Sequence, residues 1–211
     1  MEVGRRGFLR GALGAAAAVT LRPGAARARA AAAARRCAVV PERSEVRYRV
    51  REQLVGLNFP NDAVGATRAI EGAVALDATG RLVAGASRFT VDVRTLRSDE
   101  PRRDSYVRRN TLETDRYPAI VFVPRELGGL QWPPAAAAPF RVVGDLTIRD
   151  VTRVTTWEAT ATAMDGGRVG VRASTAFRFS EFDLRTPRVS VVLGVDETIR
   201  LEADLVLRPA A

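Results

Sequence analysis

The chain has 211 residues and a formal net charge of +9, from 33 basic and 24 acidic side chains. It contains no histidine, which excludes histidine metal ligands, Ser-His-Asp triads and imidazole proton shuttles. Every basic residue is arginine, and no aromatic-plus-basic motif of a nucleic-acid-binding protein is present. A single cysteine, Cys37, excludes an internal disulfide bond.

The first 30 residues carry, in the right order, the features of an export signal. Arg5 and Arg6 begin a twin-arginine-like pattern, and the apolar run over 11–21 is too short to span a membrane. A small-residue cleavage pattern ends at Ala30. We therefore expect residues 1–30 to be a twin-arginine signal peptide, cleaved near Ala30, and the mature protein to be periplasmic or secreted.

The mature chain would be a single domain that is only mildly basic. Residues 1–30 contain six arginines and one glutamate, so 27 basic and 23 acidic residues remain, a net charge of +4. The basic residues before Cys37 do not resemble a lipid-attachment site. We expect a flexible segment over 31–43 and one folded domain over 44–208.

From residue 45 onward, apolar and polar residues alternate with the period of half-buried strands. Antiparallel strands with one apolar face each can bury that face in a closed barrel, which also removes free sheet edges. The pattern predicts an all-β fold with eight strands, at about 46–51, 70–76, 83–96, 119–127, 141–149, 157–163, 168–179 and 199–207.

A short helix is predicted between two of these strands. Ser98 or Asp99 is the expected N-cap, with Pro101 in the first turn and the helix over about 102–112. Pro118 forces extended backbone on the residue before it and so ends the helix. A helix inserted between two strands of a barrel is expected to act as a plug or a lid.

The inward positions leave two alternatives open. A barrel of eight strands is either filled by its own side chains or holds one small ligand. Small inward residues would leave room for a long, thin apolar guest; these are Gly72, Ala159, Ala161, Ala163 and Ala173. Large aromatic residues could instead fill the same space; these are Tyr48, Phe89, Phe122, Trp157, Phe177 and Phe179.

Three short motifs resemble the YceI-like family: Arg103-Asp104, the YPAIVF run over 117–122, and the GDLTIRDVTR run over 144–153. Their order and spacing match over about residues 44–208. The resemblance implies a lipocalin-like, eight-stranded antiparallel barrel with a short inserted helix. It also implies export, and an apolar tunnel that carries a polyisoprenoid lipid or an isoprenoid quinone.

The chain departs from the family pattern at three positions. Asp150 and Asp183 stand where the family usually has glycine, and Phe179 stands where it usually has arginine. The alternation places residue 179 inside the barrel. An apolar ring there makes the interior more apolar and removes a partner for a ligand headgroup.

With this resemblance, a binding or carrier protein for a polyprenyl or quinone-type lipid is the favoured function. The alternatives are an envelope stress-linked or scaffold protein without a ligand and, less favoured, an enzyme acting on an isoprenoid. Glu52 is the one carboxylate that the alternation places inside, and an enzyme would need inward acid–base groups. We therefore expect no catalysis, metal, cofactor or nucleic-acid partner. Transient membrane-surface contact and a dimer are compatible with the sequence.

The predicted site has a wall and a mouth. Candidate headgroup contacts at the mouth are Arg103, Asp104 and Arg109. For the first two, capping the helix or tying it to a strand is favoured, and for Arg109 a solvated helix face is favoured. The predicted wall consists of the inward-facing residues Tyr48, Val50, Ile70, Val74, Phe89, Val91, Phe122, Leu146, Ile148, Trp157, Ala161, Val171, Ala173, Phe177, Phe179, Leu201 and Leu205.

Overall fold

The computed structural model describes residues 35–56, 59–134, 137–187 and 192–210. The predicted signal peptide, residues 1–30, lies outside them. Within the described ranges, no helix has the length and apolar character needed to cross a membrane. The strands are β1 Arg35–Val39, β2 Glu45–Leu54, β3 Asn61–Thr67, β4 Ile70–Leu76, β5 Arg88–Asp92, β6 Arg97–Ser98, β7 Ala119–Gly128, β8 Ala138–Ile148, β9 Val151–Ala163, β10 Val169–Arg178 and β11 Val192–Pro209.

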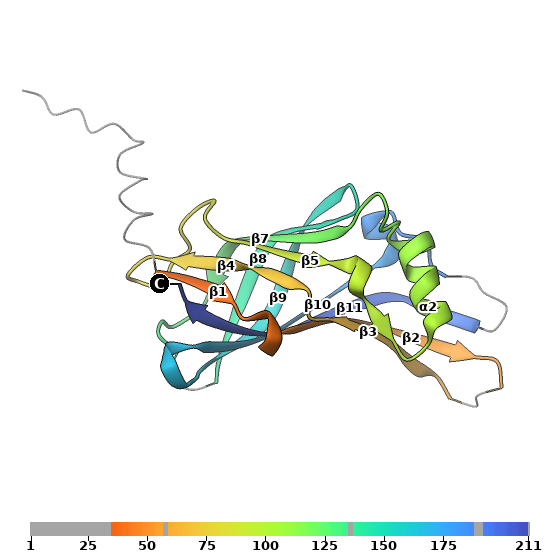
Figure 1. Cartoon of the computed structure of the whole chain (residues 1–211), viewed down its shortest axis with the longest axis horizontal. Coiled ribbons are helices and arrows are strands. Elements are labelled where there is room, and N and C mark those ends of the chain that lie inside the picture. Colours follow the sequence, from red (N-terminus) through yellow and green to blue (C-terminus); the bar gives the residue numbers. More distant parts are fainter. Residues whose placement is uncertain (1–34, 57–58, 135–136, 188–191, 211) are drawn as a thin grey trace, which may run out of the picture.

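The strands close into an antiparallel barrel, elongated along the horizontal axis of Figure 1. The closed ring has eight strands in the order β1, β4, β5, β7, β8, β9, β10 and β11, and β11 pairs back to β1. β9 has 13 residues, about 40 Å at about 3.3 Å per residue. The predicted fold class, an eight-stranded antiparallel barrel with a short inserted helix, is confirmed.

The long strand β11 pairs with three other strands, β10, β2 and β1. On one side it pairs with β10, from Thr198 to Leu207. On its other side it pairs first with β2 and then, at its C-terminal end, with β1. β2 extends the sheet beyond the ring to β3, which pairs with β6 at the end where α2 lies (Figure 1).

The N-terminal boundary of the folded domain differs from the expectation. Residues 31–43 are predicted to be flexible, yet β1 pairs with both β4 and β11 and a 3₁₀ turn, Pro41–Arg43, follows it. The reason is burial, because Cys37 and Val39 are 1% and 7% exposed between the neighbouring strands. Burial also raises the pKa of the Cys37 thiol, so the side chain behaves as a small apolar core residue.

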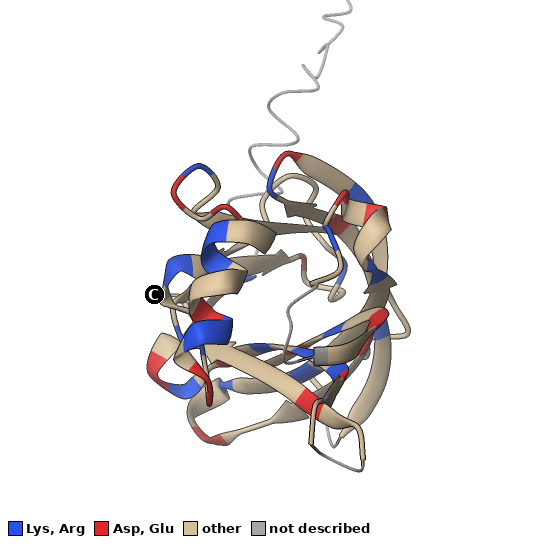
Figure 2. Ribbon diagram, turned by 90° about the vertical axis from the view of Figure 1, so that its right-hand side faces the viewer, with Lys and Arg blue, Asp and Glu red and all other residues tan. Residues whose placement is uncertain are grey.

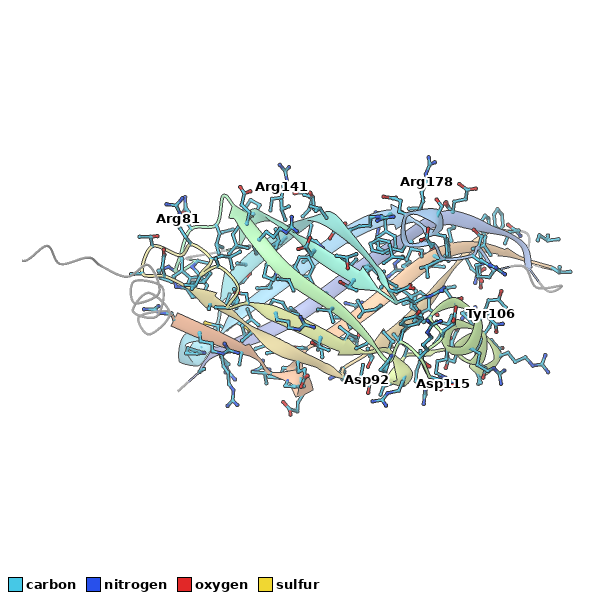
Figure 3. The ribbon with its side chains drawn as sticks, turned by 90° about the horizontal axis from the view of Figure 1, so that it is seen from above. Arg81, Asp92, Tyr106, Asp115, Arg141 and Arg178 are labelled. Atoms are coloured by element: carbon cyan, nitrogen blue, oxygen red, sulfur yellow. The ribbon has the colours of Figure 1, made fainter. Side chains whose placement is uncertain are left out.

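The strands present an apolar inner face and a charged outer face. Two apolar clusters occupy the interior, one around Leu146, Trp157 and Phe177 and the other around Ile70 and Leu76. Arginines lie on the outside: Figure 3 shows the side chains of Arg141 and Arg178 pointing away from the barrel. Asp145 and Thr147 of β8 are also on this side, where Asp145 pairs with Arg125 and Thr147 contacts Thr152.

The α-helical part of the insert is shorter than predicted, and its N-cap lies one residue after Asp99, the later of the two expected positions. α2 spans Pro101–Tyr106, and a π-helical turn, Val107–Thr111, continues it. The N-cap is Glu100, whose side chain accepts a hydrogen bond from the Arg102 amide at 2.9 Å. Ser98 and Asp99 do not cap the helix, because their side chains are engaged by Asp104 and Arg103.

Candidate functional site

A cavity of about 970 Å³ runs along the inside of the barrel. Arg103 and Thr111 line it at the end where α2 lies, and Leu76 and Trp132 line it at the opposite end. Figure 2 looks along the barrel from the α2 end, where the strands form a ring and the helix lies at one side of it. The inserted helix is therefore part of the wall at the mouth of the cavity.

Every residue of the predicted wall lines this cavity. The aromatic residues form part of the wall without filling the interior: the rings of Phe122 and Trp157 pack against each other with centroids 5.5 Å apart. Phe179 is 4% exposed and lines the cavity, but it lies in the 3₁₀ turn after β10 rather than in the strand. Of the two alternatives for the interior, the structure shows the barrel with a cavity.

A row of small side chains crosses three neighbouring strands of the barrel. Ala173 on β10 lies opposite Ala159 on β9 and opposite Ala203 on β11. Ala173 and Ala203 face the cavity directly. Ala161 also lines it but is only 1% exposed, so neighbouring side chains already enclose it.

The far end of the cavity is lined by residues that the alternation pattern did not identify. Leu130 and Trp132 belong to the connection between β7 and β8, a stretch of glycine, proline and alanine that is typical of a surface loop. Instead the Trp132 ring turns inward and its β-carbon packs at Gly80, where an added Cβ would lie only 2.5 Å away. In the sequence, this inward side chain was indicated only by its type, one large aromatic residue in a stretch of glycine, proline and alanine.

At the mouth, Arg103 and Glu52 form the innermost ion pair. The Arg103 guanidinium donates to the Glu52 carboxylate at 2.7 Å, and the two side chains are 17% and 8% exposed. Arg103 also pairs with Asp99, one turn away. Both neighbouring carboxylates raise the pKa of Arg103 against the opposing effect of its burial, so the guanidinium stays charged. The pair ties α2 to β2.

The predicted headgroup candidate Asp104 does not line the cavity. It is 7% exposed, and its carboxylate accepts hydrogen bonds from the Ser98 amide at 2.8 Å and the Ser98 hydroxyl at 2.7 Å. Asp104 therefore ties α2 to β6, which is the structural alternative that the sequence favoured. Arg109 does line the cavity, at its exposed rim, as does Arg102.

We expect the substitution Asp104→Ala to lower the free energy of unfolding by about 2 kcal/mol, because it leaves the Ser98 amide without its charged acceptor. Chemical denaturation of the variant measures this loss. The amount of bound ligand per folded molecule should match wild type, because Asp104 is outside the cavity. Asp104→Asn, which keeps an acceptor oxygen, is the matched control and should lose less. Unchanged stability with lost ligand would contradict this assignment.

Three neutral polar atoms at this end of the cavity are buried and have no hydrogen-bond partner in the described structure: Tyr48 Oη, Asn61 Oδ1 and Thr111 Oγ1. The Tyr48 ring lies over Gly65, where an added Cβ would approach Tyr48 Cε1 to 2.3 Å. Burial raises the pKa of Tyr48 to about 12, so its hydroxyl remains a neutral donor at physiological pH.

The described residues contain no group of three or more Cys, Asp or Glu side chains placed to hold a metal ion. Most of the other lining residues are apolar, and Trp132 Nε1 at the far end is buried without a partner in the described structure. Such a site can hold a long apolar molecule and offer a few hydrogen bonds to a polar group at its mouth.

A family model described as a YceI-like domain matches residues 38–207. Three solved structures share the fold at low identity. Burkholderia cenocepacia BcnA is 21% identical with a TM-score of 0.59, over 80% of this chain and 98% of that one. A Campylobacter jejuni YceI protein is 15% identical with a TM-score of 0.57, over 75% and 91%.

The third structure is a polyisoprenoid-binding domain from Saccharophagus degradans, described as implicated in plant cell wall breakdown. It is 10% identical with a TM-score of 0.64, and the match covers 84% of this chain and 99% of that one. A comparison with curated proteins gives no match.

Proposed function

Because the chain belongs to the YceI-like family, we propose that it is an exported protein that carries a long isoprenoid lipid, of the polyprenyl or quinone type, inside its barrel. The description of the Saccharophagus degradans domain as polyisoprenoid-binding supports this ligand class. Export is supported by the order of features in residues 1–30.

The observation that carries the proposal is the apolar cavity itself. Its volume of about 970 Å³ lies at the upper end of the range of about 300–1,000 Å³ that is usual for small-molecule sites. Protein interiors are normally close-packed, with few voids larger than a water molecule. An apolar cavity of this size that extends along a barrel fits a long, thin, apolar guest.

The two alternative functions have weaker support. A scaffold protein without a ligand would have no use for a cavity of this size. An enzyme would need a free acid or base within reach of its substrate. Glu52, the buried carboxylate at the mouth, is held by Arg103 and also accepts a bond from Asn61 at 3.5 Å. Binding without catalysis is therefore the function that we propose.

Thermal unfolding of protein stripped of lipid tests this proposal. A ligand that binds only the folded state at a hundred times its Kd stabilises it by about 2.7 kcal/mol, which corresponds to about 5–10 °C in Tm for a domain of this size. A quinone with a long isoprenoid chain should produce this shift, whereas the same quinone head without a chain should not. Equal effects of the two compounds, or no effect of either, would contradict the proposal.

We propose further that the α2 end meets a membrane surface briefly during lipid transfer. Exposed apolar side chains gather there: Phe59 is 80% exposed between β2 and β3, and Val55 and Leu193 are 57% and 69% exposed where β2 pairs with β11. The exposed arginines Arg102 and Arg109 lie on the same rim. Apolar and cationic groups together suit an anionic bilayer surface.

The double substitution Phe59→Ser with Leu193→Ser should weaken binding to anionic phospholipid vesicles several-fold, because it removes the side chains that would enter the interface. Co-sedimentation with vesicles measures this. Val154→Ser is the matched control, since Val154 is 58% exposed but lies on the outer face of β9. Equal vesicle binding by wild type and the double variant would exclude this rim as the contact.

Replacing both Arg5 and Arg6 by lysine should block export, because the twin-arginine pathway recognises the arginine pair. Cell fractionation followed by immunoblotting should then show full-length precursor in the cytoplasm and little mature protein outside it. Replacing Arg22 and Arg27 by lysine, in the same segment, is the control and should leave export intact. Normal delivery of the Arg5/Arg6 variant would exclude the twin-arginine route.

A further inference from the structure

We propose that the α2 end of the cavity receives a neutral headgroup, a hydroxyl or a carbonyl, and selects against a phosphate or diphosphate. This inference rests on the proposed carrier function and specifies the ligand class within it. It is carried by the charge balance of the lining, by the pairing of the innermost arginine, and by the unpartnered polar atoms at the mouth.

The charged lining residues balance each other. At the mouth, three lining arginines stand against three lining carboxylates; they are Arg102, Arg103 and Arg109 against Glu52, Asp99 and Glu100. The other two charged lining residues, Arg47 and Glu202, pair with each other at 3.4 Å. A site built for a phosphate group usually presents an excess of arginine or lysine, or several backbone amides, toward the anion. This mouth has no excess of positive charge.

The positive charge of Arg103, the innermost arginine, is already balanced by carboxylates. Arg103 contacts the carboxylates of both Glu52 and Asp99, so an incoming anion would have to compete with them. A phosphate monoester carries about −1.5 to −2 charges at neutral pH. Placing it beside Glu52, which is 8% exposed, would bring two negative groups together away from water.

The other two arginines at the mouth are too exposed to make the site prefer a phosphate over a neutral headgroup. The residues Arg102 and Arg109 lie at the solvent-exposed rim, and neither forms an ion pair in the part of the chain that the structure describes. Charges in water are screened and attract an anion only weakly. They suit the membrane contact proposed above better than an enclosed phosphate site.

The groups without partners are neutral and complement a neutral oxygen. Tyr48 Oη and Thr111 Oγ1 can each donate a hydrogen bond to a carbonyl or hydroxyl, and Asn61 Oδ1 can accept one from a hydroxyl. Buried polar groups normally have a partner, and a group left without one is costly. A hydroxyl or a carbonyl at the end of an isoprenoid chain would supply these partners without adding charge.

The test compares four isoprenoids of equal chain length, a headless hydrocarbon, an alcohol, a quinone and a monophosphate, for binding to stripped protein. Quenching or displacement monitored by tryptophan fluorescence reports the affinities, because both tryptophans of the chain, Trp132 and Trp157, line the cavity. We expect the alcohol and the quinone to bind at least tenfold more tightly than the phosphate.

Two variants test whether residues at the mouth cause this difference in affinity. Tyr48→Phe keeps the ring over Gly65 but removes the hydroxyl, so it should weaken alcohol binding about five-fold and leave the hydrocarbon unaffected. Glu52→Gln frees Arg103 from one carboxylate and should shift the preference toward the phosphate. Tyr117→Phe is the matched control, since that hydroxyl bonds to Asp150 outside the cavity, and it should change nothing.

The possible outcomes distinguish a failure of the neutral-headgroup inference from a failure of the carrier function. If the phosphate binds as tightly as the alcohol while the hydrocarbon also binds, the neutral-headgroup inference is overturned and the carrier function stands. If the Tyr48→Phe and Tyr117→Phe variants have equal affinities for the alcohol, the assignment to the mouth is wrong. If none of the four isoprenoids binds, the carrier function and the inference fall together.

Discussion

The substitution Ala173→Phe should abolish most lipid binding and leave the Tm within about 4 °C of wild type. Ala173 faces the cavity in the middle of the barrel, so a phenyl ring there fills space that the ligand would occupy. Adding bulk to an existing cavity does not strain a close-packed core, and a stability change below about 1 kcal/mol corresponds to no more than about 4 °C. Thermal unfolding and extractable lipid per protein are the two measurements.

Ala161→Phe provides the contrasting control on the neighbouring strand. The Ala161 side chain also lines the cavity, but it is 1% exposed and already enclosed by its neighbours. A ring at this position should therefore cost about 1–3 kcal/mol, as overpacking typically does. A large loss of stability for Ala173→Phe as well, with no lipid in the wild type, would mean that the interior behaves as a filled core.

The substitution Arg103→Met should lower the free energy of unfolding by about 3 kcal/mol. It removes the cation that faces Glu52 and leaves a carboxylate that is 8% exposed without its partner. Breaking a buried pair from one side usually costs about 3–5 kcal/mol, and the partial exposure of Arg103 places the effect at the lower end. Urea denaturation, analysed with a constant m-value, measures the change.

Two further variants show whether the unpaired charge is the cause. The double substitution Glu52→Gln with Arg103→Met leaves no buried charge unpaired, because Asp99, the other partner of Arg103, is 82% exposed. It should therefore recover much of the lost stability. Arg125→Met breaks the more exposed pair with Asp145 and should cost less than about 1 kcal/mol. A loss below about 1 kcal/mol for Arg103→Met alone would show that Glu52 is solvated without its partner.

The wall of the cavity was predictable because a strand has a period of exactly two residues. Once Val171 and Ala173 are placed inside, the alternation places the rest of β10 as well, and each neighbouring strand follows the same rule. The likeness of three short motifs to the YceI-like family then indicated the barrel topology. The pattern could not show whether the interior was filled, since that depends on how rings such as Phe122 and Trp157 pack.

Other features escaped the pattern for identifiable reasons. β1 is short and begins with two exposed arginines, so its buried residues Cys37 and Val39 gave little signal. β3 contains Ala63 and Gly65, which have low strand propensity, although Gly65 is needed beneath the Tyr48 ring. Trp132 lies in a connection, where no periodicity applies.

The mouth was the least predictable part of the site. The pair between Glu52 and Arg103 joins residues 51 positions apart, and local sequence carries no record of such a contact. The same holds for Tyr48, Asn61 and Thr111, which reach the cavity from different elements. Sequence alone therefore named Arg103 and Asp104 as a pair, whereas in the structure only Arg103 lines the cavity and Asp104 holds the helix to β6.

Mass spectrometry of solvent extracts from the purified mature protein tests the central claim most directly. The protein should be isolated from the envelope of its native host, together with the Ala173→Phe variant prepared in the same way. We predict that wild-type extracts contain a long-chain isoprenoid with a neutral headgroup, near one molecule per protein, and that extracts of the variant contain little. Wild-type extracts free of any isoprenoid would contradict the account.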